Sequence, residues 1–135
     1  AVDYCMATKF ASVKLSELAV GIGPFVVGPA VEHKIGMSAM SQLTIDATEW
    51  QTAQWAKDKG LYTEIFDSVD EMDSAIEKLA NTLSKSNPEA MQMLKKVFWE
   101  GTEHWDNLLL ERAAMSGKLV LSDFTRNAIN KFKKK

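Results

Sequence analysis

One acidic side chain, Glu17, stands at the point of the sequence best suited to acid/base chemistry. It follows the alternating stretch of residues 12–15 and precedes a glycine-rich turn that begins at Gly21. Such alternation predicts a half-buried strand, so we expect Glu17 at the end of a strand. Burial would favour the protonated carboxyl that a proton donor needs, and neighbouring glycines let a substrate approach the backbone. The residues alone leave two interpretations open, a catalytic acid and the commoner solvent-facing carboxylate.

The other side chains with nucleophilic or metal-binding chemistry do not form a site by their spacing. Cys5 is the single cysteine and lies in an apolar stretch without a nearby histidine, so we expect a small buried side chain. His33 and His104 lie far apart in sequence and have no neighbouring thiols. We expect both to be structural or solvent-facing, and the sequence predicts neither a metal site nor a disulfide.

Composition and charge are those of a globular domain rather than a nucleic-acid-binding or membrane protein. The 135 residues are 46% hydrophobic and 25% charged, with 16 basic against 18 acidic side chains. A net charge of −2 supplies no positive field for phosphates. Glycines and prolines interrupt the apolar run at residues 18–31, which is shorter than the roughly 20 residues a membrane span needs. Asp3 stands where a signal peptide would be basic, so we expect a cytoplasmic protein.

Short strands and helices are expected to alternate in the first part of the chain. Pro24 is suited to open a helix that Gly36 ends, with Pro29 as an alternative first turn. A capping sequence at residues 48–51 predicts a further helix, which Gly60 ends. The expected helices cover residues 24–34, 37–43 and 48–59, and the expected strands cover residues 12–15 and 61–66.

Residues 67–135 are predicted to be almost entirely helical. Ser68 and Asn87 are typical N-cap residues, Gly101 interrupts the pattern, Ser116 and Gly117 end one helix, and the last helix starts at Ser122. Large apolar side chains are too numerous for a core made by this region alone. We therefore expect the region to pack on residues 1–66 or on another subunit.

Several motifs resemble, in order, those of the crotonase superfamily, the enoyl-CoA hydratases and isomerases. They are Leu15-Ser16-Glu17, Gly21-Ile22-Gly23-Pro24, Lys34-Ile35-Gly36, a step from Ala56 to Gly60-Leu61, Asn87-Pro88-Glu89-Ala90-Met91 and Lys95. The resemblance extends over essentially the whole chain. This sequence departs from the family pattern at Ser16, where proline is frequent, and at Val2, where cysteine is usual before the acid that Asp3 matches.

The resemblance implies an α/β fold, the C-terminal part of a crotonase-like ββα spiral followed by a helical trimerisation region. Residues 1–66 would be the remnant of the spiral core that carries Glu17, and residues 67–135 the C-terminal oligomerisation region. The family's first glutamate and its oxyanion-binding N–H groups would precede Ala1. The expected partners are therefore the missing N-terminal half of the same enzyme and further copies in a homotrimer or hexamer.

The implied activity is that of an enoyl-CoA hydratase, which adds water to a 2-enoyl-CoA with Glu17 as acid/base. The resemblance places Gly23, Pro24, Gly28 and Phe124 among the substrate-binding residues. It implies no cofactor and no metal, since coenzyme A belongs to the substrate. Two alternatives stay open, a double-bond isomerase, in which one carboxylate shuttles the proton, and a non-enzymatic helical oligomerisation module. The chain alone is expected to be inactive.

Overall fold

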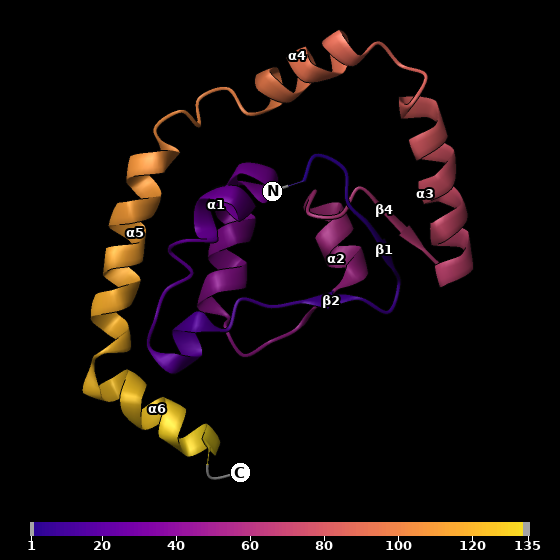
Figure 1. The fold of residues 1–135 in the computed structure, drawn as a ribbon. Helices are drawn as coiled ribbons and strands as arrows, with labels where there is room; N and C mark the ends of the chain where they lie inside the picture. The colour runs from indigo at the N-terminus through magenta and orange to yellow at the C-terminus, as the bar shows by residue number, and fades with distance from the viewer. Residues whose placement is uncertain (1, 134–135) are drawn as a thin grey trace. The chain divides into compact units, whose positions relative to one another are not determined.

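The computed structural model describes residues 2–133, which divide into two compact units (Figure 1). Unit 1 comprises the residues up to Ser12 together with Thr52–Glu103. Unit 2 comprises Val13–Gln51 together with the residues from His104 onward. Each unit thus contains residues from both sides of the expected division after residue 66. The assignment of residues 1–66 to a spiral core and 67–135 to oligomerisation stays a prediction.

Unit 1 combines a short parallel strand pair with helices. Strand β1 (Met6–Thr8) pairs with β4 (Glu64–Phe66), so that Met6 lies opposite Glu64. Helix α3 (Val69–Leu83) contacts both strands, and α2 (Ala53–Asp58) contacts β4. Small buried side chains, Ala7 of β1 and Ala53 and Ala56 of α2, allow this close packing. Helix α4 (Pro88–Phe98) completes the unit.

Helix α2 begins later than its sequence predicts. Residues 51–52 form strand β3 (Gln51–Thr52), so the predicted start at Thr48 is wrong. Thr52 is the N-cap instead, and its Oγ1 accepts a hydrogen bond from the Trp55 N–H at 3.1 Å. Thr48 and Thr52 have the same capping chemistry. Because residues 51–52 pair with β2 (Ser12–Val13) as a strand, the helix can begin only after Thr52. The predicted end is confirmed, since Gly60 has a φ of 81°.

The predicted N-caps of α3 and α4 are confirmed. Ser68 Oγ accepts from the Glu71 N–H at 3.2 Å, and Glu71 Oε2 accepts from the Asp67 N–H at 3.1 Å. Asn87 Oδ1 accepts from the N–H groups of Glu89 and Ala90 at 2.9 and 3.3 Å. These bonds satisfy amide groups that the first helical turn leaves unpaired.

Removing the α3 cap by Ser68→Ala is expected to lower the free energy of unfolding by about 1 kcal/mol, because the Glu71 N–H loses its acceptor. Urea denaturation followed by circular dichroism measures the loss. The matched control is Ser74→Ala in the same helix, where the hydroxyl donates to the Asp70 carbonyl and alanine is the better helix former. Equal destabilisation by both substitutions would contradict the capping role.

Unit 2 begins with Val13 of β2 and contains a short 3-10 helix η1 (Glu17–Val20) and three longer helices. These helices are α1 (Gly28–Ile45), α5 (Trp105–Val120) and α6 (Asp123–Lys133). Helices α1 and α6 both contact η1, and α5 contacts α6. The apolar core lies mainly on α1, at Ile35, Ala39, Met40 and Leu43. Within residues 2–133, no helix is both long and apolar enough to cross a membrane.

The structure corrects three predicted boundaries in unit 2. Glu17 does not end a strand, because β2 stops at Val13 and Glu17 opens η1. Helix α1 starts at Gly28 rather than Pro24, with Pro29 in its first turn, where the missing N–H costs nothing. Helix α5 does not end at Gly117 but continues to Val120. One glycine inside a helix costs roughly 1 kcal/mol, which the stability of the remaining residues of α5 outweighs.

The break predicted at Gly36 is confirmed. Gly36 has φ 73° and ψ 162° inside α1, so two helical segments meet there at a kink. Only glycine adopts such a conformation readily.

Candidate functional site

Glu17 is half-buried at the start of η1 in unit 2. Its Oε2 atom is buried and has no hydrogen-bond partner among the described residues. An unsatisfied buried carboxyl oxygen is costly, and folded proteins retain few of them. Oε2 is therefore an acceptor without a partner among the described residues, which leaves it available to exchange a proton with a bound molecule.

The turn after Glu17 is held by backbone hydrogen bonds and by a left-handed glycine. Gly21 has a φ of 83°, and its N–H donates to the Leu18 carbonyl at 3.0 Å. The Ile22 N–H donates to the Glu17 carbonyl at 2.9 Å. A Cβ atom on Gly21 would lie 2.4 Å from Phe124 Cδ1 and 2.9 Å from Thr125 Oγ1. Conformation and space therefore both require glycine here.

The predicted substrate-binding residues lie on either side of this turn, and their role stays a prediction. Pro24 and Gly28 are buried, and the Gly28 N–H donates to the Pro24 carbonyl at 2.7 Å. The space beside Gly23 holds the Phe25 ring, whose nearest atom lies 2.4 Å from the ideal Cβ position. In this structure the glycine accommodates a side chain of the protein itself.

Phe124 is the predicted substrate-binding residue that the structure brings to the Glu17 turn. Its ring lies against Gly21 and is 67% exposed. Its neighbour Thr125 is completely buried, and sequence reasoning did not identify it. The hydrophobic pattern of α6 gave no signal for a buried threonine.

The remaining candidate side chains lie elsewhere. Cys5 is half-buried in unit 1, where its backbone N–H donates to Thr63 Oγ1 at 3.1 Å. The rings of His33 and Trp105 pack edge to face at 5.9 Å in unit 2. Among the described residues, no group of three or more His, Cys, Asp and Glu side chains is placed to hold a metal ion.

A polar cluster in unit 1 joins Asp3 to helix α4. Its Oδ2 accepts from Lys95 Nζ at 2.7 Å, and its Oδ1 accepts from Trp99 Nε1 at 2.6 Å. Lys95 Nζ also lies 4.8 Å from the centre of the Trp99 ring. The spacing of Lys95 and Trp99 indicates a shared helix face, but no local signal relates them to Asp3, 92 positions from Lys95. These contacts give the cluster a structural role.

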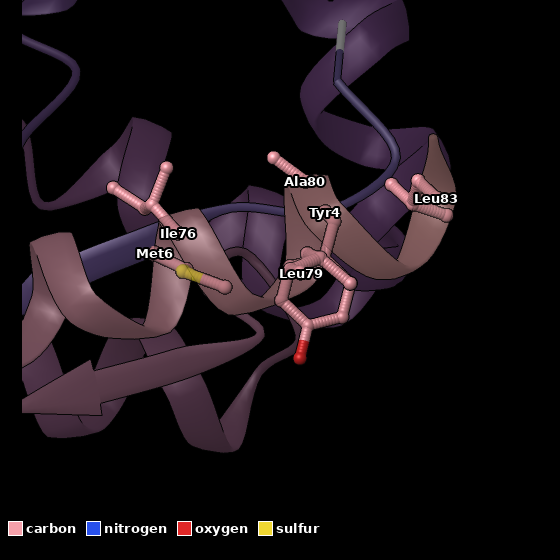
Figure 2. Close-up of a pocket in the computed structure, with 6 residues that line it drawn as sticks. All are labelled: Tyr4, Met6, Ile76, Leu79, Ala80 and Leu83. Carbon is pink, nitrogen blue, oxygen red and sulfur yellow. The ribbon is translucent and has the colours of Figure 1, made fainter. Parts of the chain in front are cut away.

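An open apolar pocket of about 310 Å³ lies in unit 1 beside β1 and α3 (Figure 2). Its lining residues are Tyr4, Met6, Ile76, Leu79, Ala80 and Leu83. The Tyr4 hydroxyl donates to Glu64 Oε1 and points away from Ile76, Ala80 and Leu83 in Figure 2. This hydrogen bond raises the pKa of Tyr4 above its ordinary value of 10.0. The pocket belongs to unit 1, whereas Glu17 belongs to unit 2.

The Glu64→Gln substitution is expected to lower the pKa of Tyr4 toward 10.0, because a neutral amide oxygen accepts a weaker hydrogen bond from the phenol than a carboxylate does and carries no charge that opposes the phenolate. In the wild type, the pKa of Tyr4 is higher in the folded than in the unfolded protein, so its hydrogen bond to Glu64 stabilises the fold. This stabilisation is complete below pH 10 and is lost as the pH rises through the pKa that Tyr4 has in the folded protein. Tyrosinate absorbance measures the titration in a Tyr62→Phe background, which removes the other tyrosine. An unchanged titration would show that Glu64 does not set the pKa of Tyr4.

Solved structures share this fold. An enoyl-CoA hydratase from Mycobacterium avium matches with a TM-score of 0.88 and 22% identity, over 98% of this chain and 51% of that chain. An enoyl-CoA hydratase/isomerase from Pseudoalteromonas atlantica T6c matches with a TM-score of 0.85 and 18% identity, over 98% and 53%. An enoyl-CoA hydratase from Bacillus halodurans matches with a TM-score of 0.83 and 19% identity, over 95% of this chain and 51% of that chain. At these identities the likeness shows the fold alone, an α/β crotonase-like one.

The chain spans about half the length of these solved structures. No curated protein matches it. The family model described as enoyl-CoA hydratase/isomerase matches residues 1–134, almost the entire chain. This match confirms the resemblance seen in the motifs around Glu17 and Asn87, and the chain belongs to the enoyl-CoA hydratase/isomerase family.

Proposed function

We propose that this chain carries the acid/base residue of an enzyme that acts on enoyl-CoA thioesters, and that this enzyme is a hydratase. The observation that carries the proposal is the buried, unpartnered Oε2 of Glu17 in a member of this family. The hydroxide of a water molecule bonds to the β carbon of the 2-enoyl thioester. Glu17 donates its proton to the α carbon, and the proton left by the water restores the carboxyl group.

We further propose that the chain corresponds to the C-terminal half of the family fold. Its coverage of about half of each solved structure supports this, as does the order of its motifs. The N-terminal half would supply the first glutamate and the oxyanion-binding N–H groups. The 135-residue chain alone should therefore give no turnover.

The helices between residues 67 and 135 are proposed to form the oligomerisation region of a homotrimer or hexamer. Large apolar side chains are exposed on each of α3, α4 and α5, including Ile76, Leu94, Val97, Phe98 and Leu110. Monomeric proteins expose few large apolar patches, so contacts with further copies or with the N-terminal half would cover these side chains.

A double-bond isomerase is the second candidate. Glu17 is the only side chain among the described residues with a buried, unpartnered carboxyl oxygen. One carboxyl group suffices to remove a proton from one carbon of a 3-enoyl-CoA and return it to another, which moves the double bond without adding water.

The deciding experiment is an assay of the protein in the form its gene encodes, after intact-mass analysis and sequencing of the gene upstream. Hydration of crotonyl-CoA supports the hydratase. Conversion of a 3-enoyl-CoA without hydration contradicts the hydratase and supports the isomerase. Turnover of neither thioester contradicts the enzymatic proposal and favours the helical oligomerisation module.

A further inference from the structure

We infer that the first turn of α6 positions Glu17, and that Thr125 is the central residue of this contact. This inference rests on the proposed function of Glu17 as the acid/base residue. The contact itself lies wholly within unit 2. Thr125 does not have to touch a substrate for this role, which makes it a positioning residue.

Contacts within α6 do not account for the complete burial of Thr125. It has no exposed surface, whereas the preceding Phe124 is 67% exposed. Its N–H donates to Ser122 Oγ at 3.3 Å, and the Ser122 hydroxyl donates to Thr125 Oγ1 at 3.2 Å. Ser122 thus orders the first turn of α6, and this turn presents Phe124 and Thr125 together.

Both residues meet the turn that follows Glu17. The Phe124 ring and Thr125 Oγ1 lie 2.4 Å and 2.9 Å from the position where a Cβ of Gly21 would be. The Gly21 N–H bonds to the carbonyls of Leu18 and Glu17. Packing of α6 against Gly21 is therefore transmitted through two backbone hydrogen bonds to the residue that bears the proposed acid.

The carboxyl group of Glu17 gains little support from its own surroundings. Because Oε2 has no hydrogen-bond partner among the described residues, no polar contact fixes the direction of that oxygen. Its position must follow from the backbone of η1 and from apolar packing. A displacement of about 1 Å at a reacting group can reduce turnover roughly 100-fold, so a contact that holds this turn matters for chemistry.

The first test uses covalent labelling of carboxyl groups with a carbodiimide and an amine, read by mass spectrometry. In the full chain, Thr125→Ala should raise labelling of Glu17 at least threefold and accelerate hydrogen exchange of the Ile22 N–H. The exposed Glu49 should label as before. Thr125→Ser, which keeps the hydroxyl, should restore most of the protection. Thr44→Val is the matched control, since Thr44 also has a buried hydroxyl in unit 2 and its substitution should leave Glu17 labelling unchanged.

Unchanged Glu17 labelling in folded Thr125→Ala protein would overturn the inference. So would a rise shared equally by Glu17 and Glu49, because it would report general loosening. If Thr125→Ala does not fold, Thr125→Val and Thr125→Ser decide. The valine variant lacks the hydroxyl and should label more strongly at Glu17 than the serine variant, and equal labelling of the two would refute the positioning role.

The labelling result does not depend on turnover, so the two proposals can fail separately. If the protein is inactive but shows the expected labelling, the contact between α6 and the Glu17 turn stands and the proposed function is refuted. In an active protein, Thr125→Ala should lower kcat about tenfold with little change in KM, as expected when a group is misplaced rather than removed. Normal kcat together with increased labelling would also overturn the positioning role.

Discussion

The Glu17→Gln variant is expected to lose the proposed enoyl-CoA turnover by a factor of about 100 to 10,000, the usual contribution of a positioned general acid or base. Glutamine occupies the same space but cannot transfer the proton that the reaction moves to carbon. The loss should fall on kcat, because the substitution does not alter the residues proposed to bind the thioester substrate. Rates of crotonyl-CoA hydration and 3-enoyl-CoA isomerisation, measured with the protein as its gene encodes it, give the result.

The matched control for this prediction is Glu49→Gln. Glu49 has the same side chain in the same unit but is exposed, so its substitution should leave both rates and stability nearly unchanged. Glu17→Gln should fold about as well as the wild type, because the amide has nearly the same shape and the buried Oε2 of Glu17 has no hydrogen bond to lose. Turnover that survives in folded Glu17→Gln protein would remove Glu17 from the mechanism.

The second large effect is expected from Gly21→Ala, which should destabilise the protein by about 2–5 kcal/mol. The left-handed conformation costs a residue with a Cβ about 1–2 kcal/mol, and overpacking against Phe124 and Thr125 adds about 1–3 kcal/mol. Chemical denaturation measures the change. The control is Gly117→Ala, in the interior of α5 with open space around it, which should stabilise the protein by about 0.5–1 kcal/mol.

A double variant separates the two costs at Gly21. Adding Phe124→Ala to Gly21→Ala removes the ring that a new Cβ would meet, so part of the lost stability should return. The cost of the positive φ should remain. If Gly21→Ala alone is as stable as the wild type, the contact between α6 and η1 does not require glycine.

Local chemistry explains why part of the fold could be predicted from the sequence. Ser68 and Asn87 cap helices because their side chains reach amide groups two or three residues ahead. Gly36 and Gly60 mark a break and an end because both have positive φ. Such features depend on a few consecutive residues, so a sequence contains what is needed to predict them.

The wrong boundaries arise where the rest of the fold decides between local alternatives. Thr48 and Thr52 have the same capping chemistry, and strand pairing favours Thr52. The alternating stretch at residues 12–15 forms a strand only at Ser12–Val13, and Glu17 opens η1, which contacts α1 and α6, instead of ending the strand. Gly117 could end a helix, but α5 continues through it. Each choice depends on contacts that are distant in sequence.

The candidate site was predictable only in part for the same reason. The order of motifs identified Glu17 and the family, and the family is confirmed. The burial of Thr125, and its place against Gly21, depend on α6 meeting a turn about a hundred residues earlier. No periodicity within α6 encodes that contact.

The division of both units into two separate segments has a consequence for synthesis on the ribosome. Strand β1 is made before its partner β4 and before the Lys95 that binds Asp3, and both follow only after the whole first segment of unit 2 has been made. The Glu17 turn likewise waits for α6, which is translated long after it. Neither unit can therefore fold completely before its second segment has left the ribosome, and nascent chains should depend on chaperones while their apolar surfaces await closure of these long loops.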